Sequence, residues 1–388
     1  MTRYGDYQME IYGAGLAGVT SRFPMTFAEL RRRAELAMPP SVWSYVAGGA
    51  GDELTQDGNA AAFGGWGLYP RMFVGAADRD LSVDLCGMSL PSPVLMAPIG
   101  VVGLCCQDGH GDLATARAAA ATGVPMIAST LSADPMEEVA AQFGGTPGLF
   151  QLYTPTDRDL AASLVKRAQA AGFRAIVVTL DTWITGWRPR DLSTGNFPQL
   201  RGHCLANYTS DPVFQDLVGP EPTTASIVST WAQLFGNPLT WDDLPWLRSL
   251  TDLPLIVKGT CHPDDARRAA DGGVDAIYCS NHGGRQANGG LPALNCLPAV
   301  AAATDLPVIF DSGVRSGADI IKAIAMGATT VAVGRPYAYG LALGGTDGIV
   351  HVLRSFLAEA DLIMAVDGYP TLADLTPQSL TRIQAPAV

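Results

Sequence analysis

One heptapeptide, Ser-Asn-His-Gly-Gly-Arg-Gln at residues 280–286, carries the side chains with the clearest chemical use. His282 can accept a proton near neutral pH, and Arg285, three residues later, supplies a fixed positive charge. The glycine pair between them lets the backbone approach a ligand closely. This combination suits a site that binds an anion and removes a proton from it. The open alternative is a polar turn whose histidine caps a neighbouring element.

An apolar run at residues 276–279 precedes the heptapeptide and predicts a buried parallel strand. Similar runs recur along the chain, separated mostly by alanine-rich segments that favour helices. This alternation predicts an α/β fold with a parallel sheet, and eight strands close a (β/α)8 TIM barrel. The predicted strands are residues 94–97, 125–128, 149–152, 175–178, 255–258, 276–279, 308–311 and 330–333. The predicted helices between them are residues 112–122, 135–143, 157–171, 263–271 and 316–326.

Polar and cationic side chains cluster at the ends of these eight runs, where a TIM barrel carries out its chemistry. Such a set favours an active site over ordinary solvated strand ends. The residues concerned are Ala97, Pro98, Ile99, Gly100, Ser129, Gln151, Tyr153, Thr179, Asp181, Lys258, His282, Arg285, Asp311, Ser312, Gly313, Val314, Arg315, Gly334 and Arg335.

The ends of the last two predicted strands point to a phosphate. Arg315 and Arg335 stand there beside Gly313 and Gly334, whose backbone amides a ligand can approach closely. A TIM barrel commonly holds a phosphate group after strands seven and eight. Taken singly, these residues could be turn glycines and surface arginines. Together they predict a phosphorylated ligand.

The rest of the chain surrounds the predicted barrel, and we expect all 388 residues to form one domain. Residues 1–90 form an N-terminal extension with helices at 26–37, where Thr26 is the N-cap and Glu29 follows, and at 40–47. The barrel spans residues 91–340, and further helices occupy residues 341–388. Residues 183–246 are rich in Pro, Gly, Asn and Asp, which predicts a long loop with one short helix near 226–235. We expect residues 186–246 to act as a lid over the barrel mouth; a surface insertion is the alternative.

Composition excludes several classes of function. A formal net charge of −12 argues against binding to nucleic acid or to an anionic membrane, so an acidic substrate needs a local cationic pocket. The seven cysteines show no CxxC or Cys/His ligand spacing, so neither a disulfide framework nor a metal site is predicted. The N-terminus does not look like a signal peptide, and no apolar stretch is long enough to cross a bilayer. We therefore expect a soluble, cytoplasmic protein.

Several motifs together resemble the FMN-dependent L-2-hydroxyacid oxidase family, which includes lactate oxidase, glycolate oxidase and flavocytochrome-type lactate dehydrogenase. The resemblance covers nearly the whole chain and implies FMN as the cofactor. The motifs are Phe-Gln-Leu-Tyr at 150–153, Val-Lys-Gly at 257–259, the heptapeptide at 280–286, Asp-Ser-Gly-Val-Arg at 311–315 and Gly-Arg-Pro at 334–336. Within the family, residues 97–104, 107–112 and 186–191 most resemble lactate 2-monooxygenase.

The resemblance implies roles for the residues around the substrate. His282 would take a proton from the substrate while two electrons pass to FMN, and Asp181 would orient the imidazole and stabilise its charged form. Arg285 and Arg188 would hold the substrate carboxylate, because a guanidinium binds a carboxylate through two hydrogen bonds. Arg190 lies close to Arg188 and could take its place. Tyr45 and Tyr153 would donate hydroxyl hydrogen bonds to the substrate.

The same resemblance implies how FMN is held. Lys258 would lie near N1 and the C2 carbonyl of the flavin, where a cation stabilises the negative charge of the reduced ring. Residues implied at the ring are Ala97, Pro98, Ile99, Ser129, Gln151, Tyr153 and Thr179. Residues implied at the ribityl chain and phosphate are Asp311, Ser312, Gly313, Val314, Arg315, Gly334 and Arg335.

Two departures from the family pattern bear on the product. Gly100 stands where many members have alanine, and a missing methyl group beside the flavin changes how product and peroxide are held together. Leu131 stands where glycolate-type members can have tryptophan, which favours a small methyl-bearing acid such as L-lactate. We therefore expect oxidation of L-lactate by O2 to acetate, CO2 and water, as in lactate 2-monooxygenase.

Other functions stay open from the sequence. A plain oxidase would release pyruvate and hydrogen peroxide instead of acetate. From another class, the barrel could be a non-redox flavin isomerase or a ligand-binding scaffold. By analogy with the family, we expect a homotetramer or homo-octamer.

Overall fold

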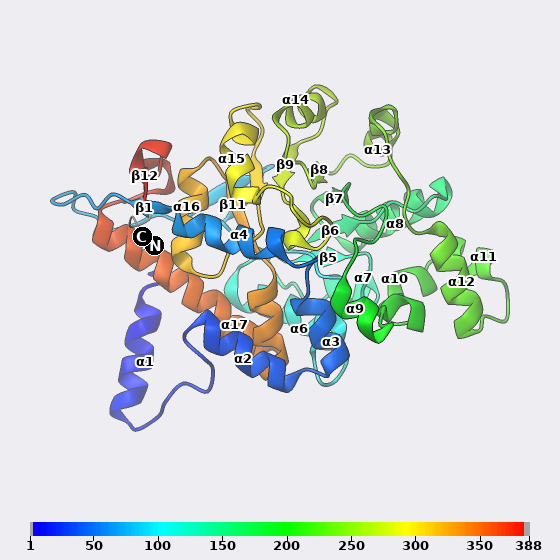
Figure 1. Cartoon of the computed structure of the whole chain (residues 1–388), viewed down its shortest axis with the longest axis horizontal. Helices are drawn as coiled ribbons and strands as arrows, with labels where there is room; N and C mark the ends of the chain where they lie inside the picture. Colours follow the sequence, from blue (N-terminus) through cyan, green and yellow to red (C-terminus); the bar gives the residue numbers. More distant parts are fainter. Residues whose placement is uncertain (1–2, 384–388) are drawn as a thin grey trace.

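A computed structural model of the chain describes residues 3–383. Eight parallel strands form one sheet, in which β4 (Val94–Met96) neighbours β11 (Thr330–Val333) and every other neighbour is consecutive in sequence. The remaining strands are β5 (Ile127–Ser129), β6 (Leu149–Leu152), β7 (Ile176–Thr179), β8 (Leu255–Lys258), β9 (Ala276–Cys279) and β10 (Val308–Phe310). A bridge between Met96 and Met126 joins β4 to β5 and closes the barrel. The predicted TIM barrel is confirmed (Figure 1).

The helices between the strands lie close to their predicted positions. They are α6 (Gly111–Thr122), α7 (Met136–Ala140), α8 (Arg158–Ala171), α14 (Pro263–Asp271) and α16 (Gly317–Ala325). Asp157 and Ser316 cap α8 and α16 by accepting hydrogen bonds from backbone N–H groups in the first turn. Among the connections between barrel strands other than that from β7 to β8, two helices were not predicted: the short α5 (Val102–Cys105) and α15 (Ala293–Ala301), which contains Pro298.

The segment predicted as a long loop is largely helical, so that prediction is wrong. It contains α9 (Pro189–Thr194), η1 (Pro198–Arg201), α10 (Ala206–Thr209), α11 (Pro212–Val218), α12 (Thr224–Leu234), η2 (Trp241–Asp243) and α13 (Leu244–Ser249). Prolines open several of these short helices at the first helical position, where the missing N–H has no helical partner to lose. Proline is also common in loops, which is why the composition of this segment predicted a loop. Only α12 corresponds to the predicted helix.

The N-terminal extension is helical, but it also contains strands. Its helices are α1 (Asp6–Leu16), α2 (Phe27–Ala37), α3 (Pro40–Ala47) and α4 (Leu54–Gly64). Thr26 caps α2 by accepting from the Glu29 backbone N–H, as predicted. β1 (Trp66–Leu68) pairs with β12 (Leu380–Arg382), so the N-terminal extension and the C-terminal segment meet in a small antiparallel sheet. The extension and the C-terminal segment therefore support each other.

The C-terminal helical segment begins before the predicted boundary at residue 341. Helix α17 (Arg335–Asp367) follows β11 directly and is kinked at Gly344 and Gly345. It packs against α6, α16, α2 and α1 (Figure 1). Two short turns, η4 (Leu372–Asp374) and η5 (Pro377–Ser379), lead to β12. No helix within residues 3–383 combines the length and apolar character needed to span a membrane.

A hairpin seals the amino-terminal end of the barrel. Strands β2 (Val83–Leu85) and β3 (Met88–Leu90) pair antiparallel, and Leu85, Met88 and Leu90 join the inward-facing side chains of the barrel in one apolar cluster. The Cys86 thiol donates to the carbonyl of Asp275, the residue before β9, which places the hairpin at the strand starts. The opposite end of the barrel is therefore the end available for chemistry.

This arrangement predicts that the hairpin stabilises the fold without shaping the site. Leu85 is 0% exposed, so Leu85→Ala leaves a cavity and should lower the free energy of unfolding by about 2–5 kcal/mol. Urea titration followed by circular dichroism measures the change. Leu36→Ala, at a position 75% exposed, is the matched control and should change stability little. Equal effects of the two substitutions would contradict the assignment.

Candidate active site

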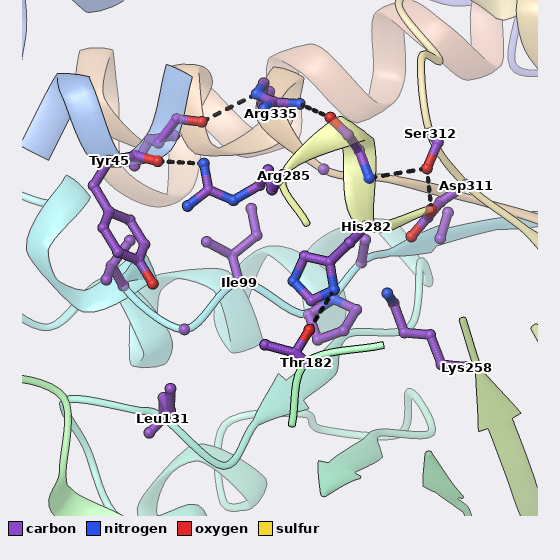
Figure 2. A pocket seen from close by; sticks show the side chains of 18 of the residues that line it. Tyr45, Ile99, Leu131, Thr182, Lys258, His282, Arg285, Asp311, Ser312 and Arg335 are labelled. Atoms are coloured by element: carbon purple, nitrogen blue, oxygen red, sulfur yellow. Dashed lines mark hydrogen bonds between the residues drawn. The ribbon is translucent and has the colours of Figure 1, made fainter. Parts of the chain in front are cut away.

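A single pocket at the carboxyl ends of the strands collects most of the predicted site residues (Figure 2). The predicted residues that line it are Tyr45, Ala97, Pro98, Ile99, Gly100, Tyr153, Arg188, Lys258, His282, Arg285, Asp311, Ser312, Gly313, Val314, Arg315, Gly334 and Arg335. Ser129, Gln151, Thr179 and Asp181 are not on its surface and lie behind it. Within residues 3–383, no three His, Cys, Asp or Glu side chains gather as a metal ion would require.

His282 is held by a carboxylate on the side away from the pocket. It starts η3 (His282–Gly284) with a left-handed φ of +59°, which is uncommon for a residue with a side chain. Its Nδ1 lies 2.8 Å from Asp181 Oδ1 and 3.0 Å from Thr182 Oγ1. Since a carboxylate only accepts, Nδ1 carries the proton and Nε2 is left with a lone pair. The ring is thereby prepared to act as a base through Nε2.

The electrostatics keep this imidazole neutral. Burial lowers the pKa of His282, and the charges of Lys258 and Arg188 lower it further, while Asp181 opposes the shift. Burial alone would raise the pKa of Asp181, but the adjacent His282 and Lys258 reverse this and hold it well below its usual range. At neutral pH an uncharged base therefore lies against a charged carboxylate, which can stabilise the imidazolium after proton uptake.

Lys258 supplies a positive charge at the end of β8. Its side chain is 3% exposed, and Nζ donates to Ser280 Oγ at 3.1 Å and lies 4.0 Å from Asp181 Oδ2. Ser280 Oγ in turn donates to Asp311 Oδ1 at 2.5 Å, and Tyr278 donates to Asp311 Oδ2 at 2.9 Å. Asp311 therefore anchors the strand ends, and the lysine keeps N–H donors available for a ligand in the pocket.

Two arginines form a cationic wall around Tyr45. The guanidinium carbon of Arg285 lies 4.8 Å from the centre of the Tyr45 ring, and that of Arg188 lies 5.6 Å from it. Burial and the neighbouring charges of Arg188 and Arg335 lower the pKa of Arg285 to about 9. Two like charges at close range favour an anionic ligand between them. Arg190 instead pairs with Glu53 at 2.6 Å and does not line the pocket.

The predicted phosphate end contains two arginines with different surroundings. Burial lowers the pKa of Arg315, and the one hydrogen bond of its guanidinium within residues 3–383 goes to the carbonyl of Val314. Arg335 donates to the carbonyls of Val46, Gly48 and Gly283 and to Gln56 Oε1. Arg315 is therefore the arginine with donors to spare for an anion, whereas most donors of Arg335 already have protein partners.

A row of buried polar side chains runs behind the pocket from β5 to β7. Ser129 Oγ donates to Gln151 Oε1 at 3.0 Å, and Gln151 Nε2 donates to Thr179 Oγ1 at 2.9 Å. Thr179 is the register partner of Lys258 on β8. The row thus reaches the lysine, as expected if it supports the polar edge of a ring held in the pocket.

Three residues of the pocket, Thr182, Phe197 and Phe235, were not predicted from the sequence. Thr182 donates to Asp181 Oδ1 at 2.8 Å and lines the pocket beside His282; its position directly after Asp181 was a usable signal. Phe197 and Phe235 form an apolar wall, each with its ring against a predicted substrate tyrosine, Tyr45 and Tyr153 respectively. Both phenylalanines come from the helical segment after β7, and no local motif distinguishes them.

Space beside Gly100 is already partly filled. A methyl group on Gly100 would lie 3.1 Å from Leu131 Cβ and 3.3 Å from its Cδ1. The Gly100 carbonyl also accepts from Gln199 Nε2 at 3.1 Å, so the helical segment after β7 is bonded to this loop. Glycine at position 100 therefore lets Leu131 approach the pocket wall, and does not simply leave an opening there.

Comparison with known proteins gives consistent matches over nearly the whole chain. The sequence model of the FMN-dependent dehydrogenase family matches residues 34–382. An L-lactate oxidase of Nostoc sp. is 40% identical over 91% of this chain and 96% of its own length. The crystal structure of a lactate oxidase of Pediococcus acidilactici superposes with a TM-score of 0.82, with 35% identity over 93% of this chain and 95% of that chain. An (S)-mandelate dehydrogenase chimera superposes with a TM-score of 0.84, with 32% identity over 92% of this chain and 99% of that chain.

The geometry predicts how His282 responds to loss of its carboxylate partner. Burial lowers the pKa of His282 and Asp181 raises it, so Asp181→Asn should lower that pKa further. Histidine-selective NMR titration of the 5 histidines measures the shift, and the other four serve as internal controls. An unchanged or raised His282 pKa in the variant would contradict the proposed pairing.

Proposed function

The chain belongs to the family of FMN-dependent 2-hydroxyacid oxidases and dehydrogenases, and on that premise we propose that it oxidises L-lactate with O2. One observation carries the proposal. A neutral histidine backed by a carboxylate shares a pocket with two arginines and a lysine, so a bound carboxylate would lie within reach of both a base and a cation. In Figure 2, the His282 ring lies between Arg285 and Lys258.

The residues present fit FMN. Arg315 is a partly buried cation whose guanidinium has one hydrogen bond to the protein within residues 3–383, so it has donors free for a phosphate. Gly313 takes a left-handed φ of +93° in the same loop. Lys258 keeps free donors at the other end of the pocket. The loops after β10 and β11 would hold the ribityl phosphate, and the row from Ser129 to Thr179 would support the ring edge. When bound, FMN supplies the two-electron acceptor.

In the proposed mechanism, Arg188 and Arg285 bind the substrate carboxylate and fix its orientation. His282 Nε2 then takes a proton from the substrate as two electrons leave it. Asp181 stabilises the imidazolium that results, and Lys258 stabilises negative charge that develops at the far side of the pocket. The hydroxyls of Tyr45 and Tyr153 orient the substrate from the side of the arginines.

A short acid suits the apolar wall. Leu131, Phe197 and Phe235 line the pocket and would contact the group attached to the carbinol carbon. L-Lactate presents only a methyl group there, and the Nostoc and Pediococcus relatives are named as lactate oxidases. Leu131 stands where glycolate-type members can have tryptophan, and the smaller leucine side chain also favours a substrate larger than glycolate.

The finer proposal concerns the product. If pyruvate stays in the pocket while O2 is reduced, peroxide can attack it, giving lactate + O2 → acetate + CO2 + H2O as in lactate 2-monooxygenase. The contact of Gly100 with Leu131 and the apolar wall from the helical segment after β7 support retention of pyruvate. We propose that this helical segment acts as the lid. The second candidate is release of pyruvate and H2O2, which the names of the lactate oxidase relatives favour. Family membership argues against a non-redox isomerase or a ligand-binding barrel.

We also propose a cytoplasmic homotetramer or homo-octamer that acts on a small 2-hydroxy acid. Support for the assembly comes from analogy with the family. Sedimentation velocity of the yellow protein measures the assembly.

Product analysis tests the function. We expect L-lactate to bleach the yellow enzyme under nitrogen, and in air to yield one acetate and one CO2 per lactate. Catalase must be present in a parallel sample, because free peroxide also decarboxylates pyruvate in solution. Acetate that persists with catalase supports the monooxygenase. Stoichiometric pyruvate in the presence of catalase, or stoichiometric peroxide in its absence, supports the oxidase. If no 2-hydroxy acid bleaches the enzyme, both candidate functions are refuted.

Gly100→Ala should shift the product ratio. The added methyl group lies against Leu131 and must displace it or the loop that carries Gly100, which changes the wall that retains pyruvate. We expect the ratio of acetate to peroxide to fall about five- to tenfold, an effect near 1 kcal/mol on the partition. Gly145→Ala is the control, because an added methyl group at Gly145 meets nothing within 4 Å. An unchanged ratio of acetate to peroxide would show that Gly100 does not control the retention of pyruvate.

A further inference from the structure

The turn that presents His282 needs support from outside itself. His282 and the next two residues all have positive φ, at +59°, +65° and +75°, and only the glycines adopt this region readily. A residue with a side chain in this region costs about 1–3 kcal/mol, and it persists only where surrounding contacts enforce it. The Asp181 contact orients the ring, so other contacts must hold the backbone.

One such contact is a reciprocal amide pair between Asn281 and Asn59. Asn59 Nδ2 donates to Asn281 Oδ1 at 2.8 Å, and Asn281 Nδ2 donates to Asn59 Oδ1 at 2.8 Å. Asn281 Oδ1 also accepts from the Gly284 N–H at 3.2 Å, which closes the turn. Asn59 Oδ1 accepts from the Ala293 N–H at 2.9 Å. Asn281 Nδ2 also donates to the Leu291 carbonyl at 3.0 Å, and the turn backbone donates to Ser280 Oγ from His282 and to Ser312 Oγ from Gly283, both at 3.0 Å. Asn59 therefore helps to fix the Asn281 amide and, through it, the turn.

Asn59 comes from the N-terminal extension. It lies in α4, far in sequence from the turn, and is 1% exposed. Its backbone carbonyl lies so close to Gly313 that a Cβ on that glycine would collide with it. One residue thus contacts the histidine turn through its side chain and the predicted phosphate loop through its backbone.

We propose that Asn59 is a positioning residue for the base: through Asn281 it holds the turn that places His282 Nε2 in the pocket. This inference rests on the proposed function only for its kinetic readout. Asn59 does not line the pocket and touches neither substrate nor reacting atoms. Because its contact with Gly313 is made by the backbone, replacing the side chain should leave the phosphate loop in place.

Kinetics of Asn59→Ala test the proposal. We expect kcat with L-lactate to fall about 10- to 100-fold, because misplacing a reacting group by about 1 Å costs on that order. The affinity for riboflavin 5′-phosphate, measured by fluorescence quenching, should change less than about threefold. Burial lowers the pKa of His282, with Lys258 and Arg188 adding to this and Asp181 opposing it. A looser, better-solvated turn should raise that pKa, so the acid limb of kcat/KM should move to higher pH.

Paired and control variants separate positioning from stability. If the two asparagines act as one unit, the double variant Asn59→Ala/Asn281→Ala should lose little more kcat than Asn281→Ala loses alone. Asn288 lies in the loop that follows the histidine turn, and its Oδ1 accepts from the Leu54 N–H at the start of α4. Asn288→Ala removes this hydrogen bond without changing the turn, so it should leave kcat unchanged. Asn59→Asp keeps the acceptor for Asn281 and Ala293 and should fall between wild type and Asn59→Ala; it also serves if Asn59→Ala does not fold.

A lowered unfolding midpoint with wild-type kcat and pH profile in both Asn59 variants would overturn the proposal, since it would leave Asn59 a purely structural role. If the wild-type protein oxidises no 2-hydroxy acid, the proposed function fails, and the positioning inference is still tested by NMR. The His282 titration should shift in Asn59→Ala and stay unchanged in Asn288→Ala. An unshifted titration would overturn it.

Discussion

Buried positive charge is the constraint on which the site depends. Lys258, Arg188, Arg285, Arg315 and Arg335 all line one pocket in a chain whose formal net charge is −12. Charges removed from water are costly unless they are paired. Among these five, the pKa of Arg285, Arg315 and Arg335 is lowered, in each case chiefly by burial. The pocket is therefore most stable when anions occupy it, and a phosphorylated cofactor with a carboxylate substrate supplies them at its two ends.

The two carboxylates at the strand ends, Asp181 and Asp311, form no ion pair with the arginines of the pocket. Asp181 is paired with His282, and Asp311 accepts hydrogen bonds from Ser280, Ser312 and Tyr278. Each therefore orients a neighbouring group and leaves the arginine wall free for a ligand. Asp181 also lies 4.0 Å from Lys258, so one carboxylate influences both the base and the cation. In the proposed mechanism, a proton taken by His282 and negative charge near Lys258 would thereby be stabilised within one connected group.

The sequence predicted the parts of the site that local patterns encode. Eight apolar runs gave the barrel strands because a strand buried on both faces is continuously apolar, and side chains after such runs must meet at one end. Lys258, His282 and Arg285 could be found in this way. The helices between residues 183 and 246 could not, because proline marks both helix starts and loops. Phe197, Phe235 and Asn59 reach the site by long-range packing, so nothing adjacent in sequence marks them. The choice between Arg188 and Arg190 depended on Glu53, a residue of the distant extension.

Arg335 shows why the extension belongs to the active site as much as the barrel does. The sequence assigned it to the phosphate, yet its guanidinium bonds the carbonyls of Val46 and Gly48 at the carboxyl end of α3, together with Gln56. Arg285 bonds Tyr45 and Gly48 in the same place. Carbonyls at a helix end carry partial negative charge and attract cations. The extension thus partly neutralises two partly buried arginines, and in return Arg285 helps to fix Tyr45 at the pocket wall. The barrel supplies the reactive groups, but their charges are balanced only when the extension is docked.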